Sequence, residues 1–101
     1  MENISGEQLK QYQLEGKKML VDLYATWCGP CKQLFPKLES LEKDYKDILF
    51  VKMDVDQNMD AALDMGIRSV PTVIIFDGEK IINRSSGVNQ DSHYKEFLDQ
   101  L

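Results

Sequence analysis

The stretch YATWCGPCKQLFP, residues 24–36, contains both cysteines of the chain, Cys28 and Cys31. It overlaps the end of MLVDLYA, residues 19–25, a run that is apolar on both faces apart from one acid. Such a run is typical of a central strand that is covered on both sides. Apolar residues at helical spacing follow the cysteines, namely Leu34, Phe35, Leu38, Leu41 and Tyr45. The stretch therefore predicts a strand that passes directly into a helix, with the cysteine pair at the junction.

Pro36 lies inside the predicted helix, where it removes one backbone donor, and we expect a kink in the helix axis there. After the helix, ILFVKMDV (residues 48–55) predicts a second strand. Strand, helix and strand in this order form a right-handed βαβ unit.

The segments around this unit predict the remaining elements. Ser5, with Gln8 three residues later, has the capping-box pattern of a short helix, and Gly16 marks the turn after it. Asn58 is a candidate cap for another short helix, which we expect to end at Gly66.

The C-terminal part predicts a hairpin and a last helix. TVIIFDGEKIINRS, residues 72–85, reads as two strands joined at Asp77-Gly78, a pair that favours a type I′ turn. The final helix carries one apolar face, made of Tyr94, Phe97, Leu98 and Leu101.

Together these elements predict a single α/β domain over residues 1–101. The expected mixed sheet is parallel in its first half and antiparallel in its second, and it lies between four helices. We expect four well-formed strands; the sequence leaves open a fifth at ENIS, residues 2–5, which would be very short.

Composition limits the function classes. A chain of 101 residues can bury one core, and 43% hydrophobic with 29% charged residues is ordinary for a soluble globular protein. The net charge of −5 argues against nucleic-acid binding, which requires a clustered basic face. No secretory signal is evident, and no apolar run approaches the roughly 20 residues that span a bilayer. We therefore expect a cytoplasmic protein that contacts neither nucleic acid nor membrane.

Two structural interpretations of the cysteine pair are disfavoured. A structural zinc site needs four ligands, and the only other strong candidate, His93, is expected at the surface of the last helix. Two chains could share a metal, although nothing in the sequence requires it. A purely structural disulfide between Cys28 and Cys31 would close too short a loop to restrict the unfolded chain.

Redox chemistry explains the surroundings of the pair better. Cys28 is predicted at the N-terminus of a helix, where unpaired amides and the macrodipole stabilise an anion. The thiolate is the attacking species in disulfide exchange, so a lowered pKa increases the reactive fraction. Cys31, one turn inside the helix, should be more buried and remain a thiol until it is needed.

Asp22 is the acid within the apolar strand, with three apolar residues on each side. Burial of a carboxylate without a partner raises its pKa, so we expect a neutral group near physiological pH. The alternative is a frayed, solvated strand end. Lys52, in the neighbouring strand, is the expected nearby charge and would limit the upward shift.

The motif WCGPCK (residues 27–32), preceded by LVDLYAT and followed by SVPT (residues 69–72), resembles thioredoxin. The terminal KEFLDQL is similar to the same family, and the match runs from about residue 19 to residue 101. The resemblance implies a thioredoxin-like α/β sandwich that reduces protein disulfides.

The resemblance also implies roles for the residues around the pair. Cys28 would be the nucleophile and Cys31 the resolving thiol, with Gly29 and Pro30 forming the turn that tunes the redox potential. Asp22, with Lys52 nearby, would be the base that takes the proton of Cys31, directly or through water.

Four further residues would bind the substrate. Trp27 would offer an apolar surface beside an exposed sulfur. The Val70–Pro71 bond would be cis, and its loop would face the cysteines and pair with the substrate backbone in a groove. Gly87 would keep that groove shallow, although a turn glycine without function is the simpler alternative.

No bound cofactor or metal is implied. The expected partners are a thioredoxin reductase, which regenerates the dithiol, and disulfide-containing substrate proteins. We expect the protein to be a monomer that forms a weak, transient complex with each of them. The alternatives left open are a thiol oxidase or isomerase, a binding subunit that uses the fold as a platform, and a metal-bridged dimer.

Overall fold

The computed structural model describes residues 1–101, and its central strand is β2 (Lys18–Tyr24). β2 runs parallel to β3 (Leu49–Asp54) and antiparallel to β4 (Thr72–Asp77). Every residue of β2 after Lys18 is buried. This confirms the predicted central strand and the mixed character of the sheet.

Two further strands complete a five-stranded sheet in the order β1-β3-β2-β4-β5. β1 (Glu2–Asn3) pairs parallel with β3, so the very short fifth strand that the sequence left open does form. β5 (Lys80–Ser86) pairs antiparallel with β4. The chain therefore forms five strands.

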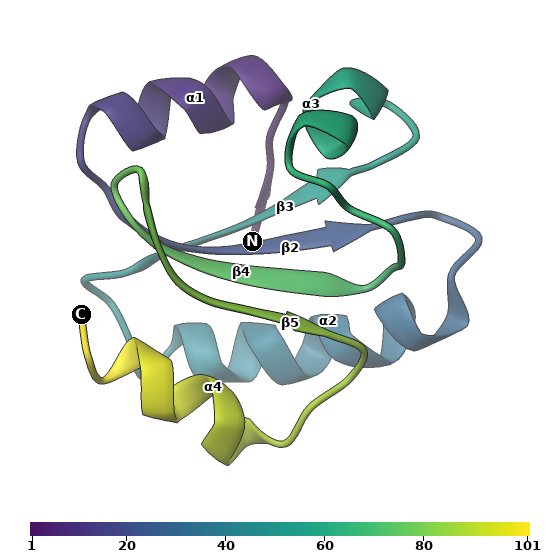
Figure 1. Cartoon of the computed structure of the whole chain (residues 1–101). Coiled ribbons are helices and arrows are strands. Elements are labelled where there is room, and N and C mark those ends of the chain that lie inside the picture. The colour runs from purple at the N-terminus through teal and green to yellow at the C-terminus, as the bar shows by residue number, and fades with distance from the viewer.

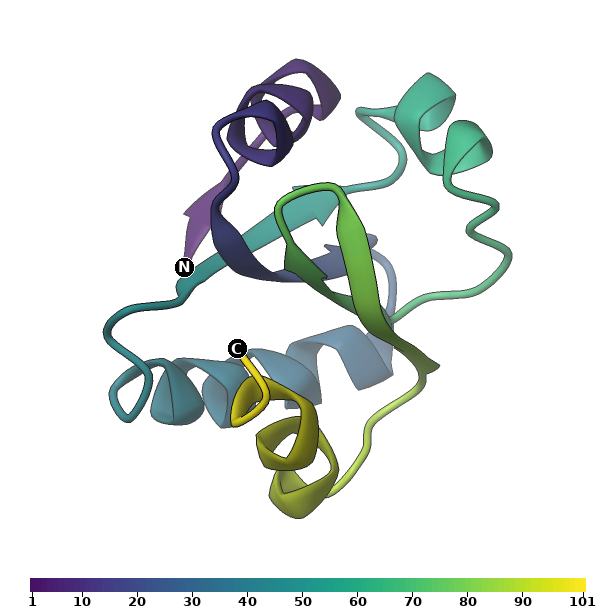
Figure 2. The same cartoon turned by 60° about the vertical axis from the view of Figure 1, so that its left-hand side comes forward.

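Four helices cover the two faces of the sheet (Figures 1 and 2). α1 (Gly6–Leu14) and α3 (Met59–Asp64) lie on one face, while α2 (Gly29–Glu42) and α4 (Asp91–Leu98) lie on the other. Alternation along the strands sends side chains to two separate cores. The α1/α3 core contains Met19, Val21, Leu23, Val51, Met53, Ile74 and Phe76. The α2/α4 core contains Leu20, Leu34, Leu38, Phe50, Ile75, Tyr94 and Leu98.

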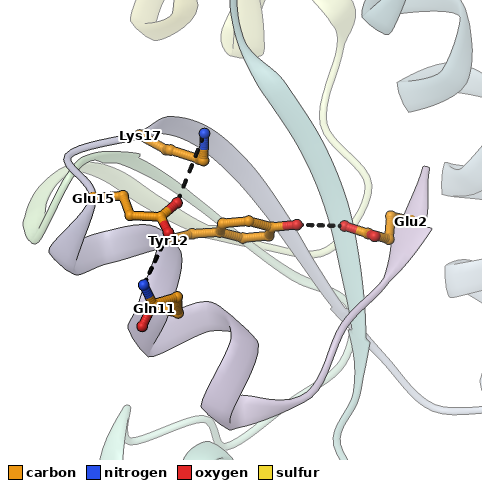
Figure 3. A network of polar contacts seen from close by, with 5 residues as sticks. All are labelled: Glu2, Gln11, Tyr12, Glu15 and Lys17. Carbon is orange, nitrogen blue, oxygen red and sulfur yellow. Dashed lines mark hydrogen bonds and ion pairs between the residues drawn. The ribbon is translucent and has the colours of Figure 1, made fainter.

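α1 begins as its sequence predicts. The Ser5 hydroxyl accepts a hydrogen bond from the amide of Gln8 at 3.2 Å. The Tyr12 hydroxyl donates to Glu2 at 2.9 Å and so ties α1 to β1 (Figure 3). Exposed contacts among Gln11, Glu15 and Lys17 follow at the C-terminal end of the helix.

Pro36 lies within α2, which continues through it over 14 residues. None of the four helices combines the length and the apolar character that a membrane crossing requires.

The hairpin between β4 and β5 has a different turn from the one predicted. Asp77 pairs with Lys80, so the two central residues are Gly78 and Glu79. Gly78 has φ +62°, and no residue other than glycine has a positive φ. A type I′ turn needs a positive φ at both central positions, whereas glycine at the first alone matches type II′. The prediction of a type I′ turn at Asp77-Gly78 was therefore wrong in turn type and, by one residue, in position.

Two smaller predictions also need correction. Asn58 is the N-cap residue of α3, as predicted, but its side chain makes no capping hydrogen bond to that helix. Its Oδ1 instead accepts the amide of Gly6 at 3.0 Å, which joins the starts of α1 and α3. His93 is half-buried because its ring packs edge-on against Tyr94 and Phe97.

Candidate active site

The cysteine pair forms a disulfide at the start of α2, with 5.3 Å between the two Cα atoms. Cys28 is the N-cap residue with extended backbone, and its sulfur accepts the amide of Cys31 at 3.2 Å. Gly29 and Pro30 occupy the first two helical positions, where a proline costs no backbone hydrogen bond. The sequence therefore places one sulfur among the unpaired amides of a helix N-terminus.

Both cysteines are buried in the disulfide form. Cys28 is 4% exposed and Cys31 is 0% exposed, so Cys31 is the more buried of the two, as expected. The expected exposed sulfur is not observed, because the disulfide is packed with Tyr24 and Ala25 and against the partly buried Phe35 and Val70.

Asp22 is fully buried and lies opposite Lys52 in the β2–β3 register. Neither of its carboxyl oxygens has a hydrogen-bond partner. Burial raises the pKa of Asp22 to about 7, while the charge of Lys52 lowers it and so limits the rise. A carboxyl group with this pKa exchanges its proton near neutral pH.

The amine of Lys52 lies over two aromatic rings, 4.6 Å from the ring centre of Phe35 and 5.5 Å from that of Tyr24. The two rings themselves meet edge-on at 5.2 Å. Because Tyr24 and Phe35 also pack against the cysteines, one small cluster links the lysine to the disulfide.

A face beside the disulfide carries the other predicted site residues. Trp27 is 70% exposed, as expected for a residue outside the core. The Val70–Pro71 bond is cis, as the resemblance predicted. The amide of Gly87 donates to the carbonyl of Pro71 at 2.9 Å, and its φ of +78° is a conformation that favours glycine.

An apolar groove of about 260 Å³ lies next to Trp27. Val70 and Ile67 form part of it, and Met59 and Leu63 of α3 form another part. A larger hollow, about 900 Å³, lies between α1 and α3; most of the residues that line it are polar, and neither cysteine is among them.

Two residues that the sequence did not reveal support this face. Asp56 accepts the indole N–H of Trp27 at 2.9 Å. Asp56 follows β3 as Trp27 follows β2, and the C-terminal ends of these neighbouring parallel strands lie at the same edge of the sheet. This position along the chain is the signal that could have identified Asp56. Arg84 of β5 donates to the carbonyls of Met65 and Gly66 at the end of α3. No local pattern marks Arg84, because its partners lie 18 and 19 residues away.

A family model described as thioredoxin matches residues 3–100. The chain belongs to the thioredoxin family. A thioredoxin from Mycoplasmoides gallisepticum is 44% identical over 91 residues, which cover 90% of this chain and 91% of that protein. Thioredoxin-2 of Saccharomyces cerevisiae is 42% identical over 73 residues, or 72% of this chain and 70% of that one.

Solved thioredoxin structures agree with the fold. The thioredoxin of Fasciola hepatica, at 33% identity, superposes with a TM-score of 0.89 and covers 99% of this chain and 98% of its own. The oxidized form of mitochondrial thioredoxin 3 from Saccharomyces cerevisiae gives 0.89 at 29% identity, covering 100% of this chain and 95% of its own. As a member of this family, the chain is a thiol-disulfide oxidoreductase that reduces protein disulfides, with Cys28 and Cys31 as its redox-active pair.

Proposed function

We propose that Cys28 is the nucleophile of this reaction and Cys31 the resolving thiol. The observation that carries the proposal is the position of Cys28 as N-cap of α2, where its sulfur accepts a hydrogen bond from the amide of Cys31. A thiolate formed there is stabilised by that amide and by the helix dipole. Cys28 attacks one sulfur of the substrate disulfide and releases the other as a thiolate. Cys31 then attacks Cys28 in the mixed disulfide, so the substrate leaves fully reduced and the pair becomes a disulfide.

Asp22 is the base for the second step. Cys31 must lose its proton before it attacks, and a buried carboxyl group with a pKa of about 7 accepts a proton at the pH of the cell. The transfer runs directly or through a water molecule. Lys52 keeps part of the Asp22 population ionised, since its charge opposes the effect of burial.

The substrate docks on the face that carries Trp27, Val70, Pro71 and Gly87. The exposed indole and the neighbouring apolar groove favour contact with apolar side chains. Gly87 adds no side chain, and nothing lies within 4 Å of the position that a Cβ would take. This face is small, so each complex is weak and transient. Gly29 and Pro30 tune the redox potential through the turn that they form.

The protein acts in the cytoplasm as a monomeric electron carrier that contributes to redox homeostasis. Residues 1–101 form one domain, and the cycle uses no bound cofactor. A thioredoxin reductase returns the disulfide to the dithiol, and disulfide-containing proteins are the substrates. The family and its relatives support both partner classes.

The decisive experiment couples oxidation of NADPH to reduction of a protein disulfide, with thioredoxin reductases of several types. We expect turnover with at least one reductase and none when Cys28 is replaced by serine. The redox potential distinguishes a reductase from an oxidase, because thioredoxins have a potential of about −270 mV and a strong oxidant such as DsbA has one of about −120 mV. A value near that of the oxidant would contradict the reductase role.

A further inference from the structure

Met59 is the first residue of α3 and is 65% exposed. It lines the apolar groove that also includes Trp27, which directly precedes Cys28, and Val70, which packs against the disulfide. Leu63, one turn further along α3, is 72% exposed and lines the same groove. The thioether of Met59 is therefore open to solvent on a surface where substrate is proposed to dock.

No other methionine of the chain is comparably accessible. Met19 and Met53 are 0% exposed in the core, and the side chain of Met1 is 2% exposed. Met65 is half-buried against the α1/α3 core. Among the five methionines, a water-soluble oxidant thus meets Met59 most readily.

In the disulfide form of the protein, the two cysteines do not compete with Met59 for peroxide. Peroxides attack the thiolate form of cysteine, and Cys28 and Cys31 lack that form while they are joined in a disulfide. Under oxidising conditions, when the disulfide accumulates, Met59 remains as the exposed sulfur of the site.

We propose that Met59 is a reversible oxidation site whose sulfoxide weakens docking of protein substrates in the groove beside the disulfide. The proposal rests on the docking face described above. In the reaction, the thioether sulfur gives an electron pair to one oxygen of hydrogen peroxide. The O–O bond breaks, an S–O bond forms, and water leaves. Methionine sulfoxide reductases reverse the change.

The groove offers little compensation for the new oxygen. A sulfoxide oxygen is a hydrogen-bond acceptor, and Asp56, which lines the same groove, already accepts the indole N–H of Trp27. With the indole N–H engaged, only Arg68 and Ser69 carry side-chain donors among the residues that line the groove, and the rest of the lining offers the new oxygen no side-chain partner. Burial of a polar group without a partner costs about 1–3 kcal/mol in proteins, so we expect a roughly 5- to 150-fold lower rate constant for protein disulfides.

The first experiment tests the site. The protein in its disulfide form is treated with hydrogen peroxide, catalase removes the excess, and mass spectrometry of peptides locates the added oxygen. We expect Met59 to be oxidised well before Met65. Equal rates at the two residues, or no oxidation of Met59, would overturn the proposal.

The second experiment tests the consequence. The peroxide-treated protein is reduced with dithiothreitol, desalted, and mixed in single turnover with insulin or with hydroxyethyl disulfide, which is too small to need the groove. We expect a slower reaction with insulin only, and recovery after treatment with both epimer-specific sulfoxide reductases. An unchanged rate with insulin would overturn the proposal. Failure of the untreated protein to reduce either disulfide would instead contradict the proposed function.

Matched variants separate the groove from general oxidation. Each is compared with its own rate before peroxide. Met59→Leu has no thioether there and should lose no activity on treatment. The double variant Leu14→Met/Met59→Leu exposes a methionine on α1, where Leu14 is 67% exposed, and should be oxidised without slowing insulin reduction. Met59→Gln, which is compared with the untreated original chain instead, should reduce insulin more slowly without any peroxide. If the Leu14→Met/Met59→Leu protein lost as much activity as the original chain, the effect would not belong to the groove.

Discussion

At the scale of the residue, Asp22 has a fully buried carboxyl group with no hydrogen-bond partner on either oxygen. Its pKa rises from the ordinary 3.8 to about 7 because burial disfavours the charge. Between these two values the folded chain holds a proton that the unfolded chain has released. Stability from this group is therefore present below pH 4 and is lost as the pH rises to 7, by about 4 kcal/mol in all.

We accordingly predict that Asp22→Asn loses this pH dependence. The variant should be more stable than the original chain above pH 7, where the original must bury a charge, and the advantage should shrink toward pH 4. Denaturant unfolding at pH 4, 6 and 8 measures it. A variant that is less stable at pH 8 would show that the carboxylate stabilises the fold.

The same substitution should slow the second half of the reaction. Without a base, attack by Cys31 on the mixed disulfide should be slower by up to about 100-fold. The first attack, by Cys28, should change much less. Single-turnover kinetics with a protein disulfide separates the two steps, and equal slowing of both would remove Asp22 from the proposed role.

The two cysteines should differ in what their serine variants trap. Cys28→Ser should abolish disulfide reduction. Cys31→Ser should accumulate a covalent mixed disulfide, because attack survives and resolution is lost. Mass spectrometry after exposure to a disulfide substrate tests both. Trapping by Cys28→Ser instead would reverse the assignment.

At the scale of the element, the contact between α1 and α3 depends on a glycine. The amide of Gly6 donates to Asn58 just before α3, and a Cβ on Gly6 would lie 2.7 Å from that of Ala61. Carbon atoms do not approach so closely without displacing a helix. Any side chain at this position should therefore push α1 away from α3.

Gly6→Ala should lower the free energy of unfolding by about 1–3 kcal/mol, the usual cost of overpacking. Ala61→Gly alone should cost about 1 kcal/mol through lower helix propensity. In the double variant the clash is removed, so the two effects should be less than additive. A double-mutant cycle by denaturant unfolding tests this coupling, and additive effects would refute the steric argument.

At the scale of the whole molecule, two cores share one sheet. Leu38 belongs to the α2/α4 core and Met53 to the α1/α3 core, and both side chains are fully buried. Because β2, β3 and β4 contribute side chains to both cores, neither core can lose its packing while the sheet persists unchanged. The chain should thus unfold as one cooperative unit.

We predict that Leu38→Ala and Met53→Ala each lower stability by about 2–5 kcal/mol and leave a single transition. Fluorescence of Trp27, the only tryptophan, reports the site, and far-ultraviolet circular dichroism reports the whole chain. The two curves should coincide in both variants. Separate midpoints would show that the two layers unfold independently.

Much of this molecule was predictable from short patterns. The apolar run through β2, the Ser5 cap of α1 and the cysteines at the start of α2 each depend on residues within a few positions of one another. Local periodicity and capping act over that range, which is why these elements match their predictions. The burial of Asp22 followed from its apolar neighbours in the same way.

Other features were decided only when the elements packed together. The indole of Trp27 meets Asp56 across 29 positions, and Asn58 binds Gly6 across 52. The burial of Cys28 and the groove beside Met59 likewise depend on how the loops after β2, β3 and α3 come together at one end of the sheet (Figure 1). Those contacts arise from strand register and helix placement, which no local pattern contains. The sequence by itself therefore determined the order of elements and the reactive pair, and the tertiary structure decided which surface surrounds that pair.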